Sequence, residues 1–181
     1  MAAMFTGNPY VNRELGRTWN LANDVRGAAV FSECGNFRPF LSRRWEAGNF
    51  VMWLCMNPSS ATDVLDDATS RKLTRHSRRL GYAGLFLLNV MDYRATDPDQ
   101  LPVGGERSQM NDCYIRWCAQ RSADIVLAYG GLRGRAEWLA FAADAIQVCG
   151  NHAFRCVDRN LDETPRHPRR FPAQFALMDW H

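Results

Sequence analysis

Four polar segments of the sequence follow apolar runs and carry residue types that can bind or activate a ligand. They are Asn57-Pro58-Ser59-Ser60 after the run 50–56, Asn89 after the run 85–88, Gly130-Gly131 after the run 125–129, and His167-Pro168 in a loop beyond the run 154–157. In open α/β sheets, ligands bind beyond the carboxyl ends of the strands. If these runs are strands of one sheet, we expect Asn57, Asn89 and His167 to meet in one cavity.

Each of these segments also has a purely structural interpretation. Asn57 precedes a proline and can simply form a turn, because the residue before proline avoids the helical region. The Gly130-Gly131 pair can serve only a tight turn between a strand and a helix. His167 lies between arginines and can be solvated. Asn89 directly follows four apolar residues, so its carboxamide must find hydrogen-bond partners close to the core.

The apolar patterns predict the elements that would position these side chains. Short β-like runs at 28–32 and 39–45 predict a hairpin, and the continuous apolar runs named above predict buried strands. Helical spacing predicts helices at about 67–80, 110–118 and 138–149. Buried strands that alternate with helices predict an α/β fold with three layers. We expect a mostly parallel central sheet, helices on both faces, and the N-terminal hairpin at one edge.

Length and composition agree with one globular unit. The chain has 181 residues, of which 46% are hydrophobic, so it can bury a sizeable core and is not a disordered or collagen-like chain. Residues 1–25 are polar and predict an N-terminal arm, and residues 26–181 predict a single α/β domain. No segment approaches the roughly 20 apolar residues that span a bilayer. We therefore expect a cytoplasmic protein with no membrane partner, whose oligomeric state the sequence does not indicate.

Neither a metal nor another cofactor is expected. The six cysteines include no Cys-x-x-Cys motif, and Cys149, His152 and Cys156 match no standard zinc spacing. The pattern Gly-Lys-Ser/Thr of a phosphate-binding loop is missing, which disfavours phosphate chemistry at residues 130–134. The pattern Gly-x-Ser-x-Gly is also missing, which disfavours an esterase.

Two clusters of arginine could contact phosphates. Arg71, Arg75 and Arg78 fall on one face of the helix predicted after Asp67, and Arg169 and Arg170 follow His167. Contacts between such side chains and phosphates would make binding depend on salt. A charged helix face is also often only solvated, and the net charge of +3 is too small to identify a nucleic-acid-binding protein by itself.

Five motifs of the chain resemble the domain-of-unknown-function family 1643 of bacteria and phages. They are Leu54-Cys55-Met56-Asn57-Pro58-Ser59-Ser60-Ala61, Asp66-Asp67-Ala68-Thr69, Leu87-Leu88-Asn89, Arg94-Ala95-Thr96-Asp97-Pro98 and His167-Pro168. The resemblance runs from about residue 29 to residue 170. It brings no settled activity with it.

The order of the motifs is more distantly similar to that of the uracil-DNA glycosylase superfamily, which also has an α/β sheet. That resemblance implies that Asn57 positions water, that Asn89 reads a pyrimidine, and that His167 stabilises the departing base. It also implies substrate contacts from Pro58, Ser59, Asn89, Gly130 and Arg169. The chain departs from the superfamily pattern at Ser59, where Tyr or Gly is usual, and at Arg169-Arg170, where Ser-Pro is usual.

The chemistry of the three side chains suits this assignment. Cleavage of an N-glycosidic bond places negative charge on the base, which a neutral imidazole can stabilise by donating a hydrogen bond. The leading hypothesis is therefore a glycosylase-like protein that binds a nucleobase in DNA or a nucleotide and cleaves the glycosidic bond of a pyrimidine, modified or not. The alternative is a non-catalytic nucleic-acid or nucleotide-binding module. In both cases Arg71, Arg75, Arg78 and Arg170 would contact phosphate.

Overall fold

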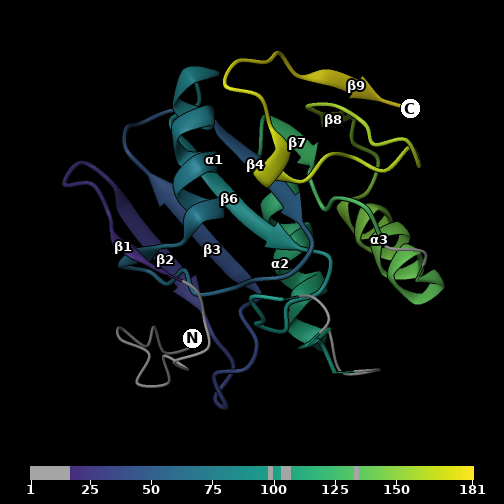
Figure 1. Cartoon of the computed structure of the whole chain (residues 1–181). Coiled ribbons are helices and arrows are strands. Elements are labelled where there is room, and N and C mark those ends of the chain that lie inside the picture. The colour runs from purple at the N-terminus through teal and green to yellow at the C-terminus, as the bar shows by residue number, and fades with distance from the viewer. Residues whose placement is uncertain (1–16, 98–99, 103–106, 133–134) are drawn as a thin grey trace.

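The fold is built on one seven-stranded sheet (Figure 1). The computed structural model describes residues 17–97, 100–102, 107–132 and 135–181. The strands are β2 (Arg26–Val30), β3 (Phe40–Arg44), β4 (Phe50–Cys55), β6 (Gly84–Asn89), β7 (Asp124–Leu127), β8 (Phe154–Cys156) and β9 (Met178–Trp180). Their order across the sheet is β2-β3-β6-β4-β7-β8-β9. The β2–β3 hairpin lies at one edge, as the sequence predicts.

The expectation of a mostly parallel sheet is wrong, because the sheet is mixed. The pairings β6–β4, β4–β7 and β7–β8 are parallel, whereas β2–β3, β3–β6 and β8–β9 are antiparallel. A separate antiparallel pair joins β1 (Trp19–Asn20) to β5 (Leu65–Asp66), so antiparallel pairings predominate among the described strands. Apolar patterns report the burial of a strand and not its direction, which depends on the connection that precedes it.

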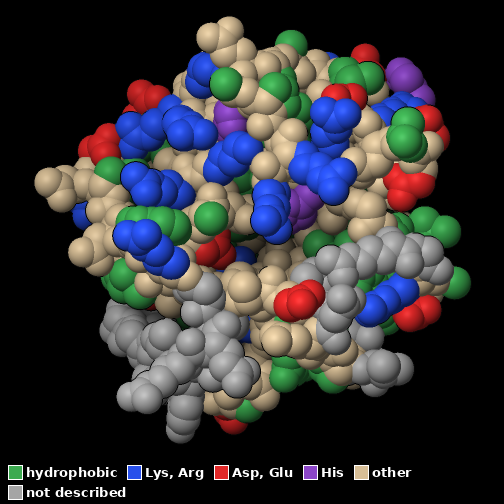
Figure 2. Space-filling model, viewed as in Figure 1, with side chains coloured by type: hydrophobic (Ala, Val, Ile, Leu, Met, Phe, Trp, Pro, Cys, Tyr) green, Lys and Arg blue, Asp and Glu red, His purple; other side chains and the backbone are tan. Residues whose placement is uncertain are grey.

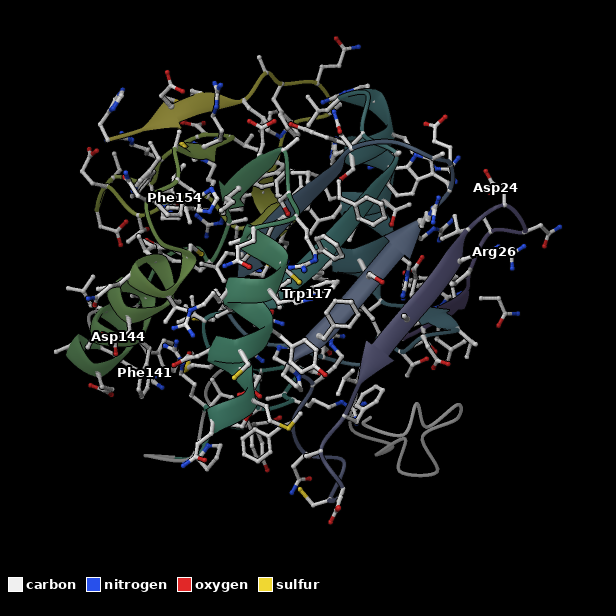
Figure 3. The ribbon with its side chains drawn as sticks, turned by 180° about the vertical axis from the view of Figure 1, so that it is seen from behind. Asp24, Arg26, Trp117, Phe141, Asp144 and Phe154 are labelled. Carbon is white, nitrogen blue, oxygen red and sulfur yellow. The ribbon has the colours of Figure 1, made fainter. Side chains whose placement is uncertain are left out.

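Helices cover both faces of the sheet. α1 (Ala68–Arg79) packs on one face, and α2 (Gln109–Ala119) and α3 (Ala136–Cys149) pack on the other (Figures 1 and 3). Side chains of β4 alternate between the two layers: Trp53 joins the cluster that contains Leu73 of α1, whereas Met52 joins the cluster that contains α2 and α3 residues. The three-layer α/β arrangement is therefore present. No helix in the described ranges has the length and apolar character needed to cross a membrane.

The face seen from behind carries an aromatic cluster (Figure 3). The ring of Trp117, on α2, lies 6.2 Å from that of Phe40 and 5.7 Å from that of Phe86. Trp117 keeps 44% of its surface exposed. The cluster anchors α2 to the antiparallel part of the sheet.

The predicted N-terminal arm is only partly described. Residues 1–16 of that arm lie outside the described residues. Of the remainder, β1 is not a loose segment, because it pairs in register with β5, Trp19 opposite Asp66. The side chain of Trp19 also lies under the guanidinium of Arg71, with 5.2 Å between that group and the ring centre.

A buried ion pair fixes the chain between β4 and α1. Arg43 of β3 is fully buried and donates from Nε to Asp66 Oδ1 at 2.9 Å. Its Nη2 donates to the carbonyl oxygens of Thr62, at 2.7 Å, and Leu65, at 2.8 Å. Asp67 then caps the N-terminus of α1, because its Oδ1 accepts from the Ser70 N–H at 2.8 Å. Arg43 thus holds residues 62–66, the part of the segment that directly precedes Asp67.

We expect Arg43→Met to lower the free energy of unfolding by about 3–5 kcal/mol, because the substitution leaves Asp66 buried without its partner. Urea denaturation at pH 7 measures this loss. The matched control is Arg44→Met on the same strand, where the side chain is exposed and the cost should be roughly 0.5 kcal/mol or less. Equal losses in both variants would contradict the role given to Arg43.

Candidate functional site

A small cavity lies where β4 and β6 end, beside the start of α1 and the short 3₁₀ helix η2 (Pro168–Arg170). Its volume is about 30 Å³. It is lined by Arg38, Cys55, Asn57, Pro58, Ser59, Asp67, Thr69, Leu87, Asn89 and His167. Since β4 and β6 are parallel and Cys55 is opposite Asn89, the last residue of β6 and the residues that follow β4 lie at the same edge of the sheet. The structure therefore brings Asn57, Asn89 and His167 together, while their roles remain predictions.

Asn57 is held in one orientation by backbone carbonyls. Its Nδ2 donates to the carbonyl oxygen of Ala95 at 2.7 Å and to that of Pro58 at 3.2 Å. Both amide hydrogens thus have acceptors, and the assignment of Nδ2 and Oδ1 follows from these bonds. Oδ1 is then the atom that Asn57 can offer to a ligand or a water molecule. The turn interpretation of Asn57 is compatible with this arrangement.

Asn89 is buried with an unused donor. Only 2% of the residue is exposed, and its Nδ2 has no hydrogen-bond partner in the described part of the chain. Its backbone carbonyl accepts from Asn111 Nδ2 at 2.9 Å, which fixes the end of β6. A buried donor without an acceptor costs about 1–3 kcal/mol. Such a group at a cavity wall is explained if a ligand or a water molecule supplies the acceptor.

His167 is positioned as a neutral hydrogen-bond donor. Its Nδ1 accepts a hydrogen bond from the backbone N–H of Arg169 at 3.1 Å, so in the neutral ring the proton is on Nε2. Burial, with a smaller contribution from the positive charge of Arg169, lowers the pKa of His167 to about 4. The imidazole is therefore uncharged at neutral pH. A neutral ring with an Nε2–H can donate to a carbonyl or an oxyanion.

Gly130 supports His167 from behind and does not line the cavity. Its φ is +80°, and a Cβ at this position would lie 2.8 Å from the Cβ of His167. Such a separation is too short for two carbon atoms in van der Waals contact. Glycine at position 130 is thus required both by the positive φ and by the close approach of the His167 Cβ. Arg169, the other flanking residue predicted to contact substrate, is exposed and also lies outside the lining.

Sequence reasoning missed several lining residues, of which Arg38 and Asp67 carry charge. Arg38 precedes β3, in a hairpin that was expected to lie only at an edge of the sheet. Asp67 is the N-cap of α1, and the same residue also lines the cavity. No signal in the sequence marked Arg38, because a single arginine in an arginine-rich chain has no distinguishing pattern.

Basic side chains gather on the surface over α1 and the adjoining C-terminal segment (Figure 2). Arg71, Arg75 and Arg170 are exposed there. Lys72 joins the two segments, because its Nζ donates to the carbonyl oxygen of Phe171 at 3.1 Å. Arg78 is already engaged: it pairs with Asp24 at 2.8 Å and lies over the ring of Trp45. A phosphate at Arg78 would have to compete with these contacts.

Cys149 and Cys156, the cysteines of the weak metal-like spacing, are buried thiols. Cys149 Sγ donates to the carbonyl oxygen of Ala145 at 3.3 Å. Burial raises the pKa of Cys149 to about 12, so the thiol stays protonated. Within the described ranges, no group of three or more His, Cys, Asp or Glu side chains could hold a metal ion.

We expect Gly130→Ala to displace His167 and to destabilise the fold more than a matched glycine substitution. Gly150 has a similar φ of +84°, but nothing lies within 4 Å of an added Cβ. Gly150→Ala therefore costs only the backbone strain, roughly 1–2 kcal/mol. The difference between the two variants in the free energy of unfolding, measured by urea denaturation, reports the cost of the contact with His167. Equal costs would show that Gly130 does not support the imidazole.

The pKa of His167 also predicts how stability depends on pH. The folded-state pKa of about 4 is below the ordinary value of 6.5, so the unfolded chain takes up the proton first as the pH falls. The low pKa of His167 therefore has no effect on the free energy of unfolding above pH 6.5. Between pH 6.5 and pH 4 it lowers this free energy, because the unfolded chain gains the proton and the folded protein does not. Burial lowers the pKa of His76 to about 4 as well, and it adds a loss in the same window.

We expect His167→Gln to reduce the loss of stability between pH 6.5 and pH 4, measured by urea denaturation at several pH values. An NMR titration of the wild-type imidazole gives a direct check, with assignment from the same variant. A midpoint for His167 near pH 6.5 would contradict a desolvated, neutral imidazole.

Comparison with known proteins places the chain in a family. The family model described as "Protein of unknown function (DUF1643)" matches residues 38–169, a range that includes Asn57, Asn89 and His167. No curated protein and no solved structure matches the chain, so the distant glycosylase resemblance has no support from these comparisons. The match covers well over half of the sequence, and the chain therefore belongs to the DUF1643 family.

Proposed function

We propose that the cavity binds a nucleobase and that the protein hydrolyses the N-glycosidic bond of a pyrimidine, modified or not, in DNA or in a nucleotide. The observation that carries this proposal is the meeting of Asn57, Asn89 and His167 at one cavity. Each contributes a different chemical group: Asn57 an amide oxygen, Asn89 an unused amide donor, and His167 a neutral imidazole N–H. The proposal also extends the resemblance to the glycosylase superfamily, whose motifs occur in the same order.

The reaction needs no strong base at the start. As the bond between C1′ and the base nitrogen breaks, its electron pair leaves with the base, and the sugar carbon becomes positively charged. A water molecule held by Asn57 Oδ1 then bonds to C1′ through its oxygen, and its released proton ends on the base. The Nε2–H of His167 donates to the base oxygen that gains charge, which lowers the barrier. Asn57 only orients the water, because a carboxamide is not a base.

Size sets a condition on this proposal. A cavity of about 30 Å³ accommodates one or two water molecules but not a pyrimidine ring. A base therefore enters only if the 57–59 segment moves apart from His167, which directly precedes η2. These two walls come from different parts of the chain, and η2 is fastened to α1 through Lys72 and the carbonyl oxygen of Phe171. Separation of η2 from the strand ends would enlarge the cavity without disturbing the sheet.

DNA is the partner that the surface favours. A base in a duplex must leave the stack to reach such a site. The exposed Arg71, Arg75 and Arg170 lie on the two segments that adjoin the cavity, and they can neutralise phosphates on either side of an extruded nucleotide. A free nucleotide would need fewer of these contacts.

A non-catalytic binding module is the second candidate. It is favoured by the geometry of Asn57, whose amide hydrogens are both used to hold the adjoining loops. A side chain committed to loop structure can persist in a protein that only binds. Such a module would hold a base between Asn89 and His167 without breaking the glycosidic bond.

We expect the protein to release free base from DNA that contains uracil or a hypermodified pyrimidine. His167→Ala should lower the rate about 100-fold, the usual effect of removing one transition-state donor, and Asn57→Ala should also lose release. Binding of the same DNA should survive in both variants. Chromatography of the released base measures the rate, and His152→Ala, an exposed histidine outside the cavity lining, is the control.

The binding module makes the opposite prediction for the same assay. It would bind DNA with an affinity that falls as salt rises, and it would release no base from any substrate. That combination would exclude the hydrolase and leave the second candidate.

A further inference from the structure

Arg38 places a buried guanidinium in the cavity wall that the proposed reaction does not use. Only 1% of the residue is exposed, and the side chain lines the cavity together with Asn57, Asn89 and His167. Arginine is almost never fully buried unless it is paired. A buried guanidinium at this position therefore needs an anionic or hydrogen-bonding partner.

The partners of Arg38 inside the protein are incomplete. Its Nη1 donates to the carbonyl oxygen of Ala61 at 2.9 Å, but its Nε is buried and has no hydrogen-bond partner. In the described ranges, no carboxylate forms an ion pair with it, whereas the neighbouring Arg43 is fully paired with Asp66. Removing a charge from water without such a partner is costly.

The charges around Arg38 do not replace that partner. Asp67 attracts the guanidinium, but Arg94 and Arg43 repel it. Burial is the main cause that lowers the pKa of Arg38 to about 10, so the group still carries its charge at neutral pH. Asp67 in turn uses its Oδ1 to accept from the Ser70 N–H at the start of α1.

A second residue of the cavity lining also keeps a buried donor without an acceptor. Asn89 Nδ2 comes from β6, and Arg38 Nε comes from the segment before β3, which is the neighbouring strand. Both N–H groups belong to residues that line one cavity, so a ligand that presents an acceptor oxygen between these residues would satisfy both. A guanidinium and an amide N–H bind a negatively charged oxygen more strongly than a neutral one.

We infer that Arg38 and Asn89 together bind an anionic oxygen of the ligand, carried by a carboxylate or by a phosphate. The inference rests on the proposed function, because it defines the substrate of that same cavity: a pyrimidine with an acidic substituent, or a nucleotide whose phosphate reaches Arg38. Asp67 in the same lining disfavours a doubly charged group. The carboxyl-substituted base is therefore the form that the charges suit better.

Calorimetry on the full chain at pH 7 tests the inference with three probes: uracil-5-carboxylate, uracil, and inorganic phosphate. We expect the wild type to bind uracil-5-carboxylate about tenfold more tightly than uracil, the usual gain from a charge-assisted hydrogen bond. Asn89→Asp has nearly the same shape and should abolish this preference, because its carboxylate pairs with Arg38 and repels the ligand. Arg38→Lys should weaken the preference, because lysine lacks the planar fork of donors.

Arg116→Lys is the matched control, because Arg116 is exposed on α2, on the opposite face of the sheet from α1. Binding of phosphate that is lost in the same two variants would assign the anionic oxygen to a phosphate. Equal affinities of the wild type for uracil and its carboxylate, with no binding of phosphate, would overturn the inference. A preference for uracil-5-carboxylate that persists in folded Asn89→Asp would also overturn the inference. If Arg38→Lys does not fold, the result for Asn89→Asp alone tests the inference.

The base-release assay separates this inference from the proposed function. Release of base without any preference for anionic probes would overturn the anion site alone. A preference for anionic probes without release of base would overturn the hydrolysis and leave the anion site supported.

Discussion

Three buried guanidinium groups hold the segment on which the cavity depends. The segment between β4 and α1 has little regular structure, so its carbonyl oxygens need donors from elsewhere. Arg38 donates to the carbonyl oxygen of Ala61, Arg43 donates to those of Thr62 and Leu65, and Arg94 donates to that of Ser59 at 3.3 Å. These arginines come from the hairpin and from the segment after β6, so the cavity wall takes shape only when the sheet is assembled.

The cavity is lined by residues that keep hydrogen-bond donors without partners. Arg38 and Asn89 each keep a buried N–H without a partner, and His167 keeps its Nε2–H because Nδ1 is used by the backbone of Arg169. An interior site with several unused donors favours guests that carry acceptor oxygens. Pyrimidines with carbonyl or carboxyl groups meet this condition, and purely apolar guests do not.

Sequence patterns predicted much of the fold because a buried strand or helix face appears in the sequence as a local pattern of apolar residues. The apolar runs at 50–56 and 85–88 correspond to β4 and β6, and the helical spacing at 138–149 corresponds to α3. The prediction of a mostly parallel sheet was wrong because the direction of a strand does not appear in its pattern of apolar residues. β9 was not predicted either, since Met178–Trp180 is short and mostly exposed and pairs only with β8.

The sequence by itself determined which polar residues end the buried strands, and with them the candidates Asn57 and Asn89, because the chain places a residue directly after each apolar run. Only the tertiary structure decided that His167 joins them, which nitrogen of its ring carries the proton, and that Arg78 is engaged by Asp24. It also revealed Arg38, whose burial depends on contacts with residues more than twenty positions away. The reason is physical: hydrogen-bond partners, desolvation and charge pairing act through space, and they exist only once distant segments have packed together.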